Sequence, residues 1–198
     1  MKRWPILPVD ALTEADRCRV GGKTMALSRL HAAGFKTPPG LVLPCECYRR
    51  YVDDTGVNSR ILFELERKAF EDMRWEEIWD AALRIRNVFT RTPLPEALSK
   101  SVADAVRARF GDQPLVIRSS APEEDADDTS FAGLHESSVN VRGEEEICRH
   151  IRVVWASLWS DRALLYRREL GLDFESSAMA VLIQPLLVGT VSGVLFTQ

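Results

Sequence analysis

The sequence predicts a mixed α+β fold, in which short apolar strands alternate with longer helical segments. Three strand-like stretches carry this prediction, residues 41–43, 115–117 and 178–187. Between them, apolar residues recur every three or four positions, as on a helix with one buried face. The 198 residues suffice for a sizeable core, and the hydrophobic share of 45% is typical of a globular protein.

The N-terminal region predicts a first strand at residues 4–9 and then a glycine turn before a helix. Gly21 and Gly22 allow a tight turn, and the helix is expected from Thr24 to about Ala33. Lys23 would then lie at a helix N-terminus, where backbone amides and the helix dipole favour an anion. The P-loop spacing is absent. A plain turn with a solvated lysine is the alternative.

The next segments predict a strand and then four helices. Residues 41–43 follow a proline-rich turn, and Pro44 opens a helix that runs to about Val52. Helical periodicity then predicts three helices within residues 58–110. We expect Trp75 and Trp79 in that region to be core or interface anchors rather than a base-stacking platform.

The most distinctive stretch is a predicted hairpin at residues 115–141. After the strand come Arg118, Ser119 and Ser120, then an acidic loop, a small-residue turn at 130–133 and a return strand at 134–141. A fixed cation, hydroxyls and exposed amides together suit a phosphate chain. The loop acids are candidates for Mg²⁺ ligands or for a solvated, mobile lid, and we favour the lid. They are Glu123, Glu124, Asp125, Asp127 and Asp128.

The C-terminal third predicts a helix or helix pair at 143–170 and a buried strand at 178–187. Gln184 interrupts this strand and must either bond to nearby backbone or point into a pocket. Another strand begins at residue 192, and the chain ends inside it, which suggests that more chain follows. Five arginines are expected on a solvated basic helix face: Arg149, Arg152, Arg162, Arg167 and Arg168.

Composition argues against several classes of protein. The net charge of −3 and pI near 5.7 give no basic excess for nucleic acid, and no apolar run is long enough for a membrane span or a signal peptide. The four cysteines lack metal-site spacing, so we expect reduced thiols, a cytoplasmic protein and no metal ligands in this chain.

Three blocks of the sequence resemble one family. They are GGKTMALSRLHAAGFKTPPGLVL, VIRSSAPEEDADDTSFAGLHESSVNV and AVLIQPLLVGTVSGVLFT, which together extend from Gly21 to Thr197. In order and spacing they are similar to the N-terminal ATP-binding domain of the phosphoenolpyruvate synthase and pyruvate phosphate dikinase family, which rifamycin phosphotransferases share. The resemblance implies an ATP-grasp fold, with residues 1–177 as the first subdomain, including the helical region 58–110. It implies that residues 178–198 form a hinge strand and the incomplete start of the second subdomain.

The resemblance also implies roles for individual residues. Lys23 and Arg118 match the family's phosphate-contacting cations, and Gly133 matches its phosphate-approaching glycine turn. Ser137 stands near the nucleotide, and Gln184 borders its pocket. Leu186 and Leu187 lie where the family holds adenine. Ser137 and the two leucines rest on the resemblance alone.

Two positions depart from the family pattern. Thr24 stands where glycine is common, and Leu134 where glutamine is common. The family's metal-binding carboxylates, its phosphohistidine domain and its pyruvate-binding barrel are not found in this sequence, so Mg²⁺ ligands are expected outside this segment. His31, His135 and His150 do not lie in the family's phosphohistidine context.

The implied function is the ATP-binding portion of a dikinase. Such a parent uses ATP to phosphorylate a histidine on a separate domain and passes the phosphoryl group to an acceptor such as pyruvate. These residues alone are expected to bind ATP weakly and to be inactive. The alternatives are a non-catalytic nucleotide-binding or regulatory module, a rifamycin phosphotransferase-like parent, and a pure interaction scaffold that uses residues 58–110.

Overall fold

The computed structural model describes residues 3–122, 137–171, 177–191 and 193. It contains a five-stranded antiparallel sheet with strand order β1-β2-β5-β3-β4. The prediction of a mixed α+β fold is therefore confirmed. The strands are β1 (Leu7–Pro8), β2 (Leu41–Leu43), β3 (Leu115–Ser120), β4 (Ser137–Val141) and β5 (Ala180–Pro185).

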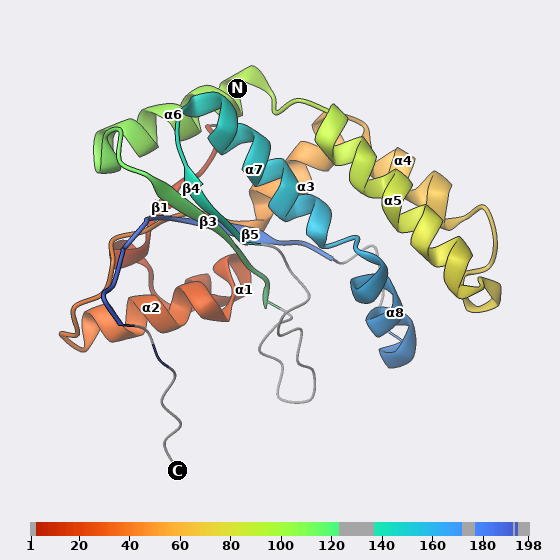
Figure 1. The fold of residues 1–198 in the computed structure, drawn as a ribbon, viewed down its shortest axis with the longest axis horizontal. Helices are drawn as coiled ribbons and strands as arrows, with labels where there is room; N and C mark the ends of the chain where they lie inside the picture. The colour runs from red at the N-terminus through yellow and green to blue at the C-terminus, as the bar shows by residue number, and fades with distance from the viewer. Residues whose placement is uncertain (1–2, 123–136, 172–176, 192, 194–198) are drawn as a thin grey trace, which may run out of the picture.

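Helices cover both faces of the sheet (Figure 1). On one side lie α1 (Arg17–Val20) and α2 (Gly22–Ala32). On the other lie α3 (Cys45–Asp54), α6 (Glu96–Phe110) and α7 (Glu144–Ser157), with α4 (Val57–Leu65), α5 (Trp75–Arg91) and α8 (Asp161–Leu170) at one end. Three short 3₁₀ turns complete the described elements, at Val9–Ala11, Glu14–Asp16 and Phe70–Asp72.

Strand β5 is the centre of the sheet. Ile183 pairs with Leu41 on β2 and with Ile117 on β3. All six residues of β5 are buried, so the expected strand covered on both sides is confirmed. The subdomain boundary expected at residue 177 stays a prediction, and β5 pairs on both sides with strands that precede that position.

Local sequence signals explain most element boundaries. The three helices expected within 58–110 are present as α4, α5 and α6. Helix α2 ends as Gly34 adopts a φ of +85°, and α8 ends at Gly171 with a φ of +62°, both in the left-handed region that glycine favours. The first strand spans only Leu7–Pro8 rather than 4–9, in keeping with the missing amide hydrogens of Pro5 and Pro8.

An aromatic cluster joins α3, α5 and α7 in the core. The Tyr51 and Trp155 rings stack with centroids 5.0 Å apart, and Tyr51 and Phe89 have centroids 6.1 Å apart. The Trp155 indole N–H donates to the Met179 carbonyl at 3.1 Å, just before β5. Ring packing and this bond together attach the helical layer to the sheet.

The expectation that Trp75 and Trp79 are core or interface anchors is narrowed by their exposure. Trp75 and Trp79 are not core residues, since they are 58% and 50% exposed, while Ile78, Ala82 and Ile85 form the buried face of α5. Their possible role at an interface stays a prediction.

The prediction of a solvated arginine face on α7 and α8 is wrong for Arg167. Arg167 is fully buried, where its Nη1 donates to the Leu158 carbonyl at 2.7 Å. Its guanidinium lies 5.9 Å from the centroid of the Trp159 ring. Arg152 and Arg168 also donate to backbone carbonyls, of Thr90 at 2.6 Å and Met73 at 3.0 Å. A long arginine can satisfy such internal carbonyls, which charge counting along a helix does not reveal.

In the described part of the chain, no helix is both long and apolar enough to cross a membrane.

Candidate functional site

The start of α2 is set by two glycines. Gly21 has a φ of +73° and precedes the first residue of the helix. Its carbonyl accepts from the Met25 amide at 3.1 Å, so the helix begins directly after the turn. Lys23 lies in the first turn with an exposed side chain. The expected position of Lys23 at a helix N-terminus is therefore confirmed, and the helix begins two residues earlier than predicted.

A buried hydrogen-bond cluster attaches this turn to the end of β3. The Ser120 hydroxyl donates to the Val20 carbonyl at 2.7 Å. The same oxygen accepts from the Thr24 hydroxyl at 2.9 Å and from the Thr24 amide at 3.3 Å. Both side chains are fully buried. Strand β3 and helix α2 are thus held together by donors and acceptors that all meet at one oxygen.

Gly21 brings the two backbones close together at the same point. A Cβ atom on Gly21 would lie 2.7 Å from the Ser120 carbonyl carbon and 2.8 Å from that of Ala121. Those neighbours are main-chain atoms, which cannot rotate away. Any side chain here would push α2 away from β3.

The strand register places Arg118 on the face that carries α2. Arg118 and Ser120 are two residues apart on β3 and therefore point to the same face. Ser120 contacts α2, so Arg118, which is exposed, lies on the same side of the sheet. No hydrogen bond or ion pair joins Arg118 to another residue that the structure describes.

Two more predicted site residues share this face. Ser137 on β4 pairs directly with Arg118, and Gln184 on β5 pairs directly with Val116. Directly opposed residues in antiparallel strands project to the same side. Gln184 is only 5% exposed, and within the described residues its side-chain Nε2 has no hydrogen-bond partner. A buried amide donor without a partner is available to an acceptor from outside the chain.

The sequence analysis expected the Ser119 and Ser120 hydroxyls to be available to an anion, and the structure shows otherwise. Ser119 and Ser120 are both buried. The Ser120 oxygen is occupied by Val20 and Thr24, and Ser119 points to the opposite face of the sheet. The prediction that these hydroxyls line a phosphate site is wrong, because strand alternation and packing turn both inward.

The remaining predicted residues are less constrained. Leu186 follows β5, and its amide donates to the Pro114 carbonyl at 2.8 Å. Leu187 is 67% exposed. Gly133 and the acidic stretch at 123–128 lie outside the described residues.

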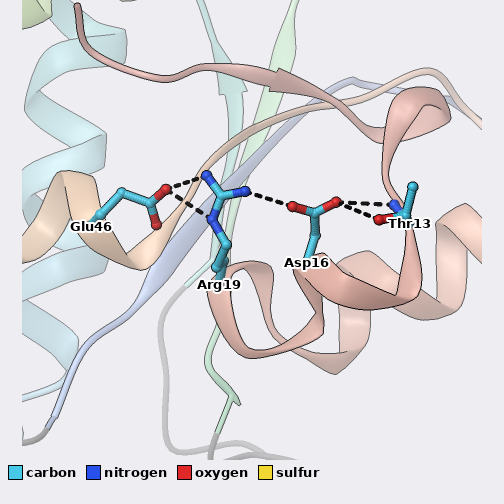
Figure 2. Close-up of polar contacts among 4 residues, drawn as sticks. All are labelled: Thr13, Asp16, Arg19 and Glu46. Carbon is cyan, nitrogen blue, oxygen red and sulfur yellow. Dashed lines mark hydrogen bonds and ion pairs between the residues drawn. The ribbon is translucent and has the colours of Figure 1, made fainter. Parts of the chain in front are cut away.

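A second polar network anchors the segment before α2 (Figure 2). Arg19 Nη1 donates to Asp16 Oδ1 at 2.6 Å, and its Nε donates to Glu46 Oε1 at 3.0 Å on α3. Asp16 Oδ2 accepts from the amide and the hydroxyl of Thr13 at 3.0 and 3.1 Å. These hydrogen bonds, chiefly that of the Thr13 amide, lower the pKa of Asp16 below its ordinary value. The α1–α2 junction is thus held by α3 as well as by β3.

Neither a metal-binding cluster nor the cavity described below lies on the Arg118 face of the sheet, as far as the described residues show. Among the described residues, no group of three or more histidine, cysteine, aspartate or glutamate side chains gathers to hold a metal ion. A cavity of about 530 Å³ lies between α6 and α7, lined in part by Lys100, Cys148 and Arg152. Helices α6 and α7 cover the opposite side of the sheet from α2, so this cavity is separate from the Arg118 face.

Residues 17–198 match the family described as the pyruvate phosphate dikinase AMP/ATP-binding domain. The chain belongs to this family. The resemblance expected from the three sequence blocks is therefore confirmed.

Curated relatives support the same family. The chain is 41% identical over its whole length to the phosphoenolpyruvate synthase of Aeropyrum pernix, of which it covers 24%. It is 34% identical over 89% of its length to a probable phosphoenolpyruvate synthase of Methanothermobacter thermautotrophicus, of which it covers 26%. It is also 34% identical over 97% of its length to a rifampicin phosphotransferase of a Streptomyces species, of which it covers 22%. The chain spans about a quarter of the length of these relatives.

Within this family domain, the contact of Thr24 with Ser120 is a feature that the sequence analysis missed. The sequence analysis noted Thr24 only as a departure from the family pattern and assigned it no partner. No local signal pairs a threonine at the start of a helix with a serine 96 residues later. Only the pairing of α2 with β3 brings the two together.

Proposed function

We propose that this domain binds ATP on the α2 side of the sheet, with its phosphate chain between Lys23 and Arg118. The carrying observation is the contact of Thr24 with Ser120, since Lys23 adjoins Thr24 and Arg118 lies two residues before Ser120 on the same face. Two long cationic side chains from different elements can therefore approach one anion. The family name, AMP/ATP-binding domain, supports a nucleotide as that anion.

The other proposed contacts lie on the same face or just beyond it. Gln184 would donate its side-chain amide, which has no partner among the described residues, to the nucleotide, and Ser137 would contact the nucleotide beside Arg118. Leu186 and Leu187 would border the adenine, and Gly133 keeps its predicted role at the phosphates. A buried amide donor at Gln184 fits an acceptor-rich ligand.

The chemistry of phosphoryl transfer suits this arrangement. Such reactions need positioning and charge neutralisation more than covalent help from the protein. Lys23 would supply a point charge, and Arg118 a planar fork that matches phosphate oxygens. Both would stabilise negative charge that develops on the transferred group. ATP carries Mg²⁺ in this proposal, and the metal's ligands are expected outside this segment.

We propose further that the parent protein is an ATP-dependent dikinase of the phosphoenolpyruvate synthase type. The phosphoryl group would pass from ATP to a histidine nitrogen on a separate domain, and then to an acceptor such as pyruvate. The names of the relatives from A. pernix and M. thermautotrophicus support this reading. A cytoplasmic location is part of the same proposal.

A rifamycin phosphotransferase-like parent is the second candidate. Its support is the 34% identity to a rifampicin phosphotransferase, equal to the identity with the M. thermautotrophicus relative. The parent protein, incubated with ATP and either pyruvate or rifampicin, distinguishes the two candidates by which acceptor becomes phosphorylated. Nucleotide binding without phosphorylation of any acceptor or of the protein itself would favour a regulatory module.

The binding site is tested by titration calorimetry of the 198-residue chain with ATP and Mg²⁺ at millimolar concentration. We expect Lys23→Met and Arg118→Ala each to weaken ATP binding by about ten- to a hundredfold, because each removes charged hydrogen bonds worth about 1.5–3 kcal/mol. The matched controls are Lys100→Met and Arg60→Ala, exposed cations on helices of the opposite layer, which should bind as wild type does. Equal affinity of all five proteins would place the nucleotide elsewhere. An absence of ATP binding by the wild-type chain would refute the proposal for this domain.

A further inference from the structure

The hydroxyl of Ser120 stands in for a missing helix cap. Gly21 occupies the N-cap position of α2 and has no side chain with which to bond the first turn. Thr24 is the third helical residue, and its amide is one of those that a helix leaves without an internal partner. A capping serine ordinarily bonds such an amide from within the same helix. Here the acceptor is Ser120, which belongs to β3.

The cap is part of a closed set of bonds rather than a single contact. Ser120 Oγ accepts both the amide and the hydroxyl of Thr24 and donates to the Val20 carbonyl. It therefore bonds the last residue of α1 and the first turn of α2 at once. All these groups are buried, so water cannot replace the bonds at low cost.

Covalent neighbours transmit this geometry to the two cations. Lys23 is one residue from Thr24, about 3.8 Å between Cα atoms. Arg118 is two residues from Ser120 along an extended strand, about 7 Å. The bonds between Thr24 and Ser120 thus fix the spacing of the Lys23 and Arg118 backbones. A misplacement of about 1 Å in a binding group can cost a large factor in function.

We propose that Thr24 and Ser120 are positioning residues that set the separation of Lys23 and Arg118 for a triphosphate, an inference that rests on the proposed ATP site. Neither residue touches the ligand in this proposal, because both side chains are fully buried and their hydroxyls are already engaged in hydrogen bonds within the protein. Their effect should therefore depend on the phosphate chain of the ligand. A ligand without phosphates should be insensitive to them.

The sequence supplies a matched control in the neighbouring serine. Ser119 is equally buried, but it lies on the opposite face of the sheet, and its hydroxyl has no hydrogen-bond partner within the described residues. Ser119→Ala removes the same atom as Ser120→Ala, one position away, without breaking a hydrogen bond to any described residue. Thr24→Val and Thr24→Ser form a second pair, because valine keeps the shape of threonine and serine keeps its hydroxyl.

The test measures the affinity of each folded variant for Mg²⁺-ATP and for adenosine by calorimetry, with circular dichroism and thermal unfolding to verify the fold. We expect Ser120→Ala and Thr24→Val to weaken ATP binding about tenfold while adenosine binding changes less than twofold. Thr24→Ser and Ser119→Ala should bind both ligands as wild type does. If Ser120→Ala fails to fold, Thr24→Val against Thr24→Ser decides the matter.

A double-mutant cycle separates positioning from general stability. If Ser120 acts through Lys23, then Ser120→Ala should add little to the loss already caused by Lys23→Met. Full additivity of the two losses, or equal losses for ATP and adenosine, would overturn the inference. If Ser120→Ala and Thr24→Val bind ATP with wild-type affinity while Lys23→Met binds it more weakly, the positioning inference is overturned. The proposed ATP site would not be affected by that result. Unchanged affinity in Lys23→Met would instead refute the proposed function.

Discussion

The Thr24 and Ser120 side-chain oxygens are 2.9 Å apart, although the residues are 96 positions apart in the chain. This contact joins the first turn of α2 to the last residue of β3. It holds the backbone around Lys23 beside the end of β3 that carries Arg118. Gly21, which lies against the Ser120 backbone, allows the approach.

Gly21 is expected to tolerate no side chain. Gly21→Ala should destabilise the domain by about 3 kcal/mol or more, because it combines a positive φ with a clash against main-chain atoms of Ser120 and Ala121. Gly34→Ala is the control, since Gly34 has a φ of +85° but nothing within 4 Å of a Cβ. That variant should lose only about 1–2 kcal/mol. Urea unfolding of both variants measures the difference, and equal losses would contradict the close approach of α2 to β3.

The hydrogen bond from the Trp155 indole to the Met179 carbonyl should contribute to stability beyond the packing of the aromatic ring. Trp155→Phe should lower the free energy of unfolding by about 2 kcal/mol, because a buried carbonyl loses its donor and a small cavity remains. Trp79→Phe, on an exposed residue, should change stability by less than about 0.5 kcal/mol. Denaturant midpoints compare the two, and a neutral Trp155→Phe would show that this bond contributes little.

Asp16 should contribute to the loss of folding stability at acidic pH. Its pKa lies below the ordinary value of about 3.9, because the Thr13 amide, together with the Thr13 hydroxyl and Arg19, stabilises the carboxylate. A depressed pKa stabilises the fold above about pH 4, and this stabilisation is lost as the pH falls through the folded-state pKa. Asp16→Asn should therefore reduce the loss of stability between pH 5 and pH 3.

The control for this measurement is Asp53→Asn. The Asp53 carboxylate makes no hydrogen bond or ion pair with another described residue. Urea midpoints at several pH values should show the wild-type slope for Asp53→Asn and a shallower slope for Asp16→Asn. Identical slopes for all three proteins would contradict the role of the network in Figure 2.

The free cysteines should differ in reactivity. Cys18 is exposed, whereas Cys45 and Cys47 are buried. Burial raises the pKa of the Cys47 thiol to about 12, and it also raises the pKa of Cys148. With a thiol reagent at pH 8, Cys18 should react first, and Cys47 should react about a hundredfold more slowly or only after unfolding. The reason is that little of the Cys47 thiol is ionised at this pH and the reagent cannot reach the buried sulfur. Peptide mapping after timed labelling identifies the sites, and rapid labelling of Cys47 in the folded protein would contradict its burial.

The order of the strands and of the longer helices was predictable because their signals are local, whereas the short helix α1 and the 3₁₀ turns were not predicted. Apolar periodicity predicted the three helices within residues 58–110, and a continuous apolar run predicted the central strand β5. The glycine and proline positions located several boundaries. Arg167 was misplaced, and the choice between core and interface for Trp75 and Trp79 could not be made, because the exposure of a helix residue depends on which neighbours cover it. Large apolar or charged side chains do not by themselves tell which way a helix is turned.

The sequence by itself determined the family, the element order and the two candidate cations, since each depends on motifs or periods within a few residues. Tertiary structure alone decided that Arg118 faces α2, that Ser119 and Ser120 turn inward, and that Thr24 bonds across to β3. Such relations depend on the register and packing of segments distant in the chain, where hydrogen bonds between buried groups select one arrangement. A linear pattern records each residue's chemistry but not which partner the fold brings to it.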